Sequence, residues 1–258
     1  MTRRDAMIGY NRTVRLRWLD ETVDLFLVGQ NATEIIETLR ERLKDQLSIG
    51  SNAERGSREK TITILLKTWV RVPSRVRDLR DDAIELLHNI PRADRLSLHW
   101  GMTMAVYPFW RTVADVAGRL FRLQGSAEAR QVQRRVRELL GEREAVSRST
   151  RYVLRAFSEW GVIVDGHEKG CYTPSAPFHI ENPRLASWLV EATLLASESP
   201  SGDFRVLVNS PALFPFQIAR LSVDTLARSG RLTVVRHGME EALVQLRQTL
   251  PEASTPRL

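Results

Sequence analysis

Arginine forms the most chemically suggestive pattern in this sequence. Of the 38 basic side chains, 34 are arginine, and a planar guanidinium group suits phosphate oxygens and base edges. Residues 101–160 carry 11 basic and 6 acidic side chains, a net charge of +5, whereas residues 161–258 carry 9 and 10. Because the positive charge is concentrated in the middle of the chain, we expect a polyanion to bind there.

Two consecutive helical patterns carry these arginines, one at 126–140 and the next at 147–160. The buried side of the first pattern is marked by Val132, Val136 and Leu139, and that of the second by Val146, Val153, Phe157 and Trp160. The opposite side of each pattern carries only arginines, namely Arg130, Arg134 and Arg137 on the first and Arg148, Arg151 and Arg155 on the second. An ordinary solvated face interleaves both signs, so these stripes favour nucleic-acid contact. The alternative is that these helices present an ordinary solvated surface, which is rich in arginine because the protein comes from a GC-rich genome.

A short hairpin pattern follows the two helices. The β-type runs 162–164 and 171–173 flank a turn that ends at Gly170. Helix, helix and hairpin in this order predict a winged helix-turn-helix over 125–180, whose second helix enters the major groove. That interpretation places Arg148, Arg151 and Arg155 in the groove, and Ser147 at the helix N-cap. It also makes Ser149 and Thr150 phosphate donors, and it puts His167 and Lys169 at the wing tip, near a phosphate or the minor groove.

Weaker basic clusters lie nearer the start of the chain. Arg12, Arg15 and Arg17 precede the first predicted helix, and a second set surrounds Pro73. Asp78, Asp81 and Asp82 follow the second set and can pair with it, so we interpret it as solvated surface.

The residue types in the sequence give little support for an enzymatic function. The five histidines are scattered without metal-ligand spacing, and neither a P-loop, a dinucleotide-binding glycine motif nor a G-x-S-x-G motif occurs. His99, within an apolar run, is typical of a core histidine. Cys171 is the only cysteine, which excludes a disulfide, and we interpret it as buried filler. The sequence therefore predicts a non-catalytic protein without a cofactor or metal.

The elements that must position the arginines are mainly helical. Asn31 and Glu34 have the spacing of a capping box before a helix that reaches Leu47, and 48–58 is a polar loop. Further helices are predicted at 59–71 and 75–89. The apolar stretch 92–123 should form two helices, because Pro108 interrupts it. We expect these helices to form a bundle over 1–124.

The last third of the chain predicts a smaller α+β module over 181–250. Its pattern indicates helices at 184–198, 217–228 and 239–249 and strands at 204–208 and 232–235. A second, degenerate winged-helix-like unit is one interpretation of this order. The tail 251–258 is expected to be disordered. The predicted fold class is thus mainly α: a helical bundle, a winged helix-turn-helix and a small α+β module.

Nothing in the sequence predicts a membrane segment. The longest charge-free stretches, 96–110 and 206–219, are shorter than the roughly 20 apolar residues that span a bilayer. The first 18 residues have no apolar signal-peptide core, so we expect a cytoplasmic protein.

The order of these parts resembles the BrxA family of BREX phage-defence systems. The resemblance is carried by Asn31 to Leu47, by RLSLHWGMTMAVYPFW, by the basic helix and, most closely, by SRSTRYVLRAFSEWGVIVD at 147–165. It implies a helical N-terminal part with winged-helix-like elements, and DNA binding without catalysis in support of host protection. At the matching positions it points to Arg148, Arg151 and Arg155. The chain after Pro200 departs from the family pattern.

The expected function is binding of double-stranded DNA, largely electrostatic and therefore salt-dependent. Other defence-system proteins are possible further partners. Two alternatives stay open: an adaptor between proteins of a larger assembly, and a ligand-responsive transcriptional regulator with the bundle as its sensor. Oligomeric state, sequence preference and the choice between DNA and RNA are not determined by these patterns.

Overall fold

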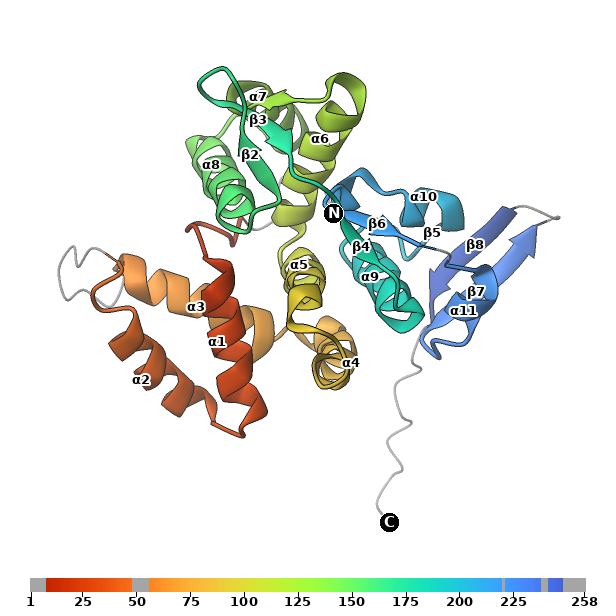
Figure 1. Ribbon diagram of the computed structural model, residues 1–258, viewed down its shortest axis with the longest axis horizontal. Helices are drawn as coiled ribbons and strands as arrows, with labels where there is room; N and C mark the ends of the chain where they lie inside the picture. Colours follow the sequence, from red (N-terminus) through yellow and green to blue (C-terminus); the bar gives the residue numbers. More distant parts are fainter. Residues whose placement is uncertain (1–7, 48–55, 220, 238–240, 248–258) are drawn as a thin grey trace, which may run out of the picture.

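The computed structural model describes residues 8–47, 56–219, 221–237 and 241–247, and helices dominate these ranges (Figure 1). This confirms a mainly helical fold with small sheets of two or three strands in its second half. Within the described ranges, none of the helices has the length and apolar character needed to cross a membrane. The first half consists of α1 Leu16–Leu27, α2 Ala32–Arg42, α3 Ser57–Trp69, α4 Arg77–Leu87, α5 Arg95–Val106 and α6 Pro108–Gln124, with 3₁₀ turns at Ser74–Val76 and Arg92–Asp94.

Local signals set several of these helix boundaries as predicted. The Asn31 side chain accepts hydrogen bonds from the backbone N–H groups of Thr33 and Glu34, and the Glu34 carboxylate accepts one from the Asn31 N–H, so the capping box is confirmed. Pro108 separates α5 from α6 and occupies the first position of α6, where its missing N–H costs nothing. Residues 48–55 of the predicted polar loop lie outside the described residues.

A helix–strand–helix–helix–hairpin unit occupies the middle of the chain. It comprises α6, β1 Ala127–Glu128, α7 Ala129–Leu140, α8 Glu144–Glu159, β2 Ile163–Asp165 and β3 Cys171–Pro174. The three strands form an antiparallel sheet in the order β1–β3–β2. The two helices and the hairpin agree with the prediction, and β1 is an additional strand that pairs with the far arm of the hairpin.

The C-terminal part repeats this order with shorter helices and one insertion. Its elements are β4 Phe178–Ile180, α9 Pro183–Leu195, β5 Ser201–Asp203, α10 Phe204–Val208, a 3₁₀ turn η4 at Pro211–Leu213, β6 Phe216–Ile218, α11 Val223–Ala227, β7 Leu232–His237 and β8 Glu241–Leu246. The antiparallel sheet has the order β5–β8–β7, which again is first, third, second. In both units the first strand runs directly into the following helix. The inserted β6 pairs in parallel with β4.

Three predicted elements of this module are wrong. Residues 204–208 form a helix rather than a strand; the Asp203 side chain caps it by accepting a hydrogen bond from the backbone N–H of Val206, and Leu207 is buried in an apolar cluster. Only the five residues of α11 are helical within 217–228, which begins in strand β6. Residues 241–246 form a strand rather than a helix, since they pair with both β5 and β7. Residues 238–240 and the tail 251–258 lie outside the described residues.

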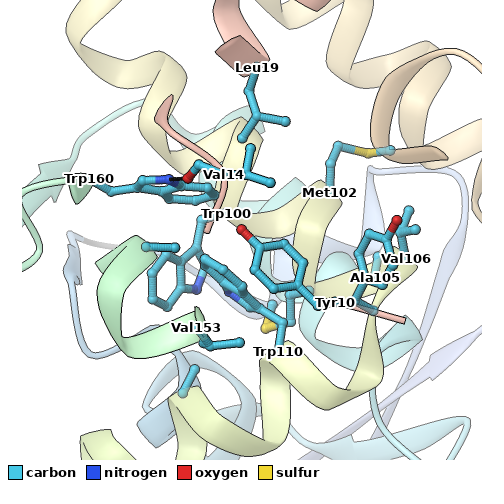
Figure 2. Packing of buried hydrophobic residues seen from close by; sticks show 14 of the residues in the cluster. Tyr10, Val14, Leu19, Trp100, Met102, Ala105, Val106, Trp110, Val153 and Trp160 are labelled. Carbon is cyan, nitrogen blue, oxygen red and sulfur yellow. Dashed lines mark hydrogen bonds between the residues drawn. The ribbon is translucent and has the colours of Figure 1, made fainter. Parts of the chain in front are cut away.

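An aromatic core joins the helical bundle to the middle unit (Figure 2). The Trp100 ring lies 5.3 Å from that of Trp110, and the Trp110 ring lies 4.8 Å from that of Trp160 on α8. The Trp100 indole N–H donates to the carbonyl of Ala212, at 3.1 Å. A Cβ atom at Gly118 of α6 would lie only 2.0 Å from the Pro211 carbonyl oxygen, so α6 and η4 are in direct backbone contact. The C-terminal end of α8 is therefore packed into the aromatic core through Trp160.

Candidate nucleic-acid interface

Helix α8 presents the predicted arginines to solvent. Val153 and Phe157 are fully buried, and Arg148, Arg151 and Arg155 are exposed on the other side of the helix. The helix begins at Glu144, with Arg143 in the N-cap position and no side-chain cap, so the predicted N-cap at Ser147 is wrong. The earlier start places one more turn of helix before the arginines, and they lie in the body of α8 rather than at its end.

Helix α7 presents its arginines less uniformly. Val132 and Val136 are fully buried, as predicted, and Arg130 and Arg134 are exposed. Leu139, which the sequence pattern placed on the buried side, is 39% exposed, so that part of the prediction is wrong. Arg137 is half-buried, because it lies near the end of α7 where the chain turns toward α8.

The arginine stripes are not free of acidic partners, which corrects the sequence interpretation. Three of the six arginines form ion pairs with nearby glutamates: Arg134 with Glu138 at 3.8 Å, Arg137 with Glu142 at 3.3 Å, and Arg151 with Glu144 at 3.3 Å. Exposed pairs of this kind contribute little stability and exchange readily for other partners. Among the described residues, Arg130, Arg148 and Arg155 have no carboxylate partner and are the strongest candidates for phosphate contact.

Ser149 and Thr150 do not lie on the protein surface, where a side chain must lie to donate a hydrogen bond to a DNA phosphate. Ser149 is 3% exposed and Thr150 is fully buried. The Thr150 hydroxyl donates to the Val146 carbonyl at 2.9 Å, inside its own helix. Ser149 and Thr150 precede the buried Val153 by four and three residues, so helical spacing places both side chains on the core-facing side of α8. Their predicted role as phosphate donors is therefore wrong.

The hairpin between β2 and β3 carries the predicted basic tip. His167 and Lys169 are both exposed in the turn, which is closed by a hydrogen bond from the Gly166 N–H to the Cys171 carbonyl at 2.8 Å. Gly170 adopts a φ of 81°, a conformation that glycine adopts without strain. Cys171 is half-buried rather than fully buried, with a free thiol.

One arginine that the sequence assigned to a separate, weaker cluster lies beside α8. The guanidinium carbon of Arg12 is 5.7 Å from the ring centre of Tyr152, on α8. The basic cluster before the first helix was visible in the sequence, but its packing against residues 140 positions later was not.

No side-chain group suggests a metal centre in the part of the chain that the structure describes: no three His, Cys, Asp or Glu side chains are close enough to bind an ion together. The chain matches no family model, no curated protein and no solved structure.

Proposed function

We propose that this protein binds double-stranded DNA without catalysing a reaction, using the middle unit as a winged helix-turn-helix. The succession α6, β1, α7, α8 and a β2–β3 hairpin, with the sheet order β1–β3–β2, is the arrangement that such domains use. On this proposal α8 is the recognition helix and the hairpin is the wing.

A single observation carries the proposal: Arg148 and Arg155 are exposed on α8, and neither has a carboxylate partner among the described residues. They are seven residues apart, two helical turns, so their side chains emerge about 10 Å apart along the helix axis. That spacing lets one helix contact a groove wall at two points. Arg130 on α7 and Lys169 on the hairpin extend the positive charge to the neighbouring elements, and His167 lies in the same exposed turn as Lys169.

Binding of this kind is mainly electrostatic, because guanidinium groups that contact phosphates release counterions from DNA. The paired arginines Arg134, Arg137 and Arg151 can exchange their glutamates for phosphates at low salt. We propose further that the chain acts as an accessory component of a bacterial phage-defence system. This part of the proposal rests on the resemblance of the sequence to the BrxA family, which implies a helical N-terminal part like the one formed by α1 to α6.

A second candidate function, an adaptor between proteins, is favoured by the charge pattern of the C-terminal unit. Two of its described arginines form ion pairs, Arg236 with Asp224 and Arg231 with Glu191 of α9 and Asp82 of α4. A repeated unit whose charges are balanced suits a protein partner better than DNA.

The test is a titration of the purified chain against a random duplex of about 30 base pairs at about 50 and 200 mM salt. We expect affinity in the micromolar range or tighter at low salt and a steep loss at high salt. The variant Arg148→Glu with Arg155→Glu should lower the affinity by well over about tenfold. Arg77→Glu with Arg92→Glu is the matched control, because it makes the same charge change at exposed positions. One is the first residue of α4 and the other lies in the 3₁₀ turn after α4, a helix that is far from α8 in Figure 1.

Equal binding by the wild type and the α8 variant would contradict the proposed site. Equal losses in both double variants would indicate a general charge effect rather than a surface on α8. Absence of binding at low salt, together with a salt-resistant protein partner in a pull-down, would favour the adaptor.

A further inference from the structure

The chain segment that precedes α1 is packed against α8. Tyr10 and Val14 of this N-terminal segment, residues 8–15, are buried in the aromatic core (Figure 2). The Trp160 indole N–H donates to the Val14 carbonyl at 2.9 Å, across 146 positions of sequence. The segment is therefore held against the same helix that presents the exposed arginines.

Arg12 is the basic residue of this segment that lies nearest the middle of α8. Its guanidinium carbon is 5.7 Å from the ring centre of Tyr152, within the range of a cation–π contact. Its Nε donates to the Ser57 hydroxyl at 3.1 Å, at the start of α3. Among the described residues Arg12 has no carboxylate partner, so no protein carboxylate there offsets its charge.

Tyr152 places Arg12 next to the exposed arginines of α8. Residues three and four apart are neighbours on a helix surface, and Arg148 and Arg155 are four before and three after Tyr152. The guanidinium over that ring therefore borders the stripe on α8. Glu159, the acidic residue on the same side of the helix, is 3.6 Å from Arg15 rather than beside Arg12.

We propose that Arg12 is part of the polyanion-binding surface, so that DNA bound at α8 also contacts the N-terminal segment. The inference rests on the proposed function. On this proposal the helical N-terminal part contacts DNA directly through Arg12. The contacts with Tyr152 and Ser57 hold the Arg12 side chain in place before DNA binds. A preset side chain loses less conformational entropy when it contacts a phosphate.

The competing explanation is that Arg12 has a purely structural role and only stabilises the packing of the N-terminal segment against α3 and α8. The salt dependence of binding separates the two explanations, because a lost phosphate contact reduces the salt slope and a lost structural contact does not. We expect Arg12→Gln to weaken binding about three- to tenfold at low salt and to reduce the slope of log affinity against log salt by about 1. Arg12→Lys, which keeps the charge, should restore most of the slope.

Arg17→Gln is the matched control, because it removes one charge from an exposed residue of α1 that bonds to Gln46. It should leave the slope unchanged. Ser57→Ala removes the anchor but keeps the Arg12 charge, so it should also keep the slope even if thermal stability falls. Circular dichroism melting of each variant sets a temperature at which all are folded.

The two proposals fail differently. If Arg148→Glu with Arg155→Glu binds like the wild type, the proposed function is wrong. If that double variant loses binding while Arg12→Gln keeps both affinity and slope, only the role of Arg12 is wrong. A loss in Arg12→Gln that Arg12→Lys does not restore, with an unchanged slope, would likewise show a purely structural role.

Discussion

Trp69 donates its indole N–H to Nδ1 of His99, at 3.0 Å, inside the helical bundle. An indole N–H can only donate, so Nδ1 must be unprotonated and the ring proton lies on Nε2, 3.1 Å from Oδ1 of Asp20. His99 is fully buried, as its apolar surroundings in the sequence suggested. The relay links α1, α3 and α5 through three side chains, and burial lowers the pKa of His99 despite the opposing effect of Asp20.

This lowered pKa predicts a loss of stability in mild acid. The unfolded chain takes up a proton on His99 as the pH falls below about 6.5, and the folded chain takes it up only at lower pH. The free energy of unfolding should therefore decrease as the pH falls from about 7.5 to 5.5. Urea unfolding across this range measures the effect. The variant His99→Gln should be less stable but show a flatter profile, and parallel profiles for the two proteins would contradict the assignment.

A second prediction concerns the ion pair between Arg231 and Glu191. Two hydrogen bonds, 2.8 and 3.0 Å long, join the guanidinium to the carboxylate of Glu191, which is 4% exposed. Arg231→Met would leave this carboxylate buried without its partner, which costs about 3–5 kcal/mol of the free energy of unfolding. Adding Glu191→Leu should recover most of that loss, because no deeply buried charge then remains unpaired. Asp82, the other carboxylate partner of Arg231, has a side chain that is 35% exposed and can be solvated by water. Denaturant titrations of both variants test this, and a double variant no more stable than Arg231→Met would refute it.

A third prediction follows from the burial of Thr150. Replacing Thr150 by valine removes the hydroxyl but keeps the side-chain shape, and that hydroxyl bonds to the backbone of its own helix. DNA affinity should stay within about twofold of the wild type, whereas Arg155→Ala on the same helix should weaken binding by more than that. A large loss of affinity in Thr150→Val, with the fold intact, would mean that the hydroxyl reaches DNA after all.

Elements set by local chemistry were predictable from the sequence. The cap at Asn31, the interruption at Pro108 and the two helices before the hairpin all depend on neighbouring residues. The exposure of the six arginines followed in the same way from helical spacing, except for the half-buried Arg137.

The errors come from interactions that spacing does not reveal. Residues 241–246 have a helix-like composition, yet Ala242 and Val244 are buried on one side of a strand that is paired along both of its edges. Residues 204–208 are rich in β-type side chains, yet they form a helix that is capped by Asp203 and buries Leu207 against α9 residues Val190 and Leu194 in one cluster.

The candidate site shows the same limit. The pairing of Arg134 with Glu138, four residues later, was visible as a spacing, but the pairing of Arg151 with Glu144 spans two turns. The contact of Arg12 with Tyr152 depends on how the N-terminal segment packs and could not be derived from either stretch alone.

The residues that the structure describes form two buried apolar clusters of very unequal size. The smaller one consists of Val190, Leu194, Leu207, Leu226, Leu232 and Val244. Helix α9 joins both clusters, since Leu185 and Leu189 belong to the larger one. Regions with few buried apolar contacts open at a lower free energy than the rest of a protein. Backbone amides of β7 and β8 should therefore exchange with deuterium before those of α5 and α6, and a protease should trim the C-terminal unit while the arginine-bearing helices stay intact.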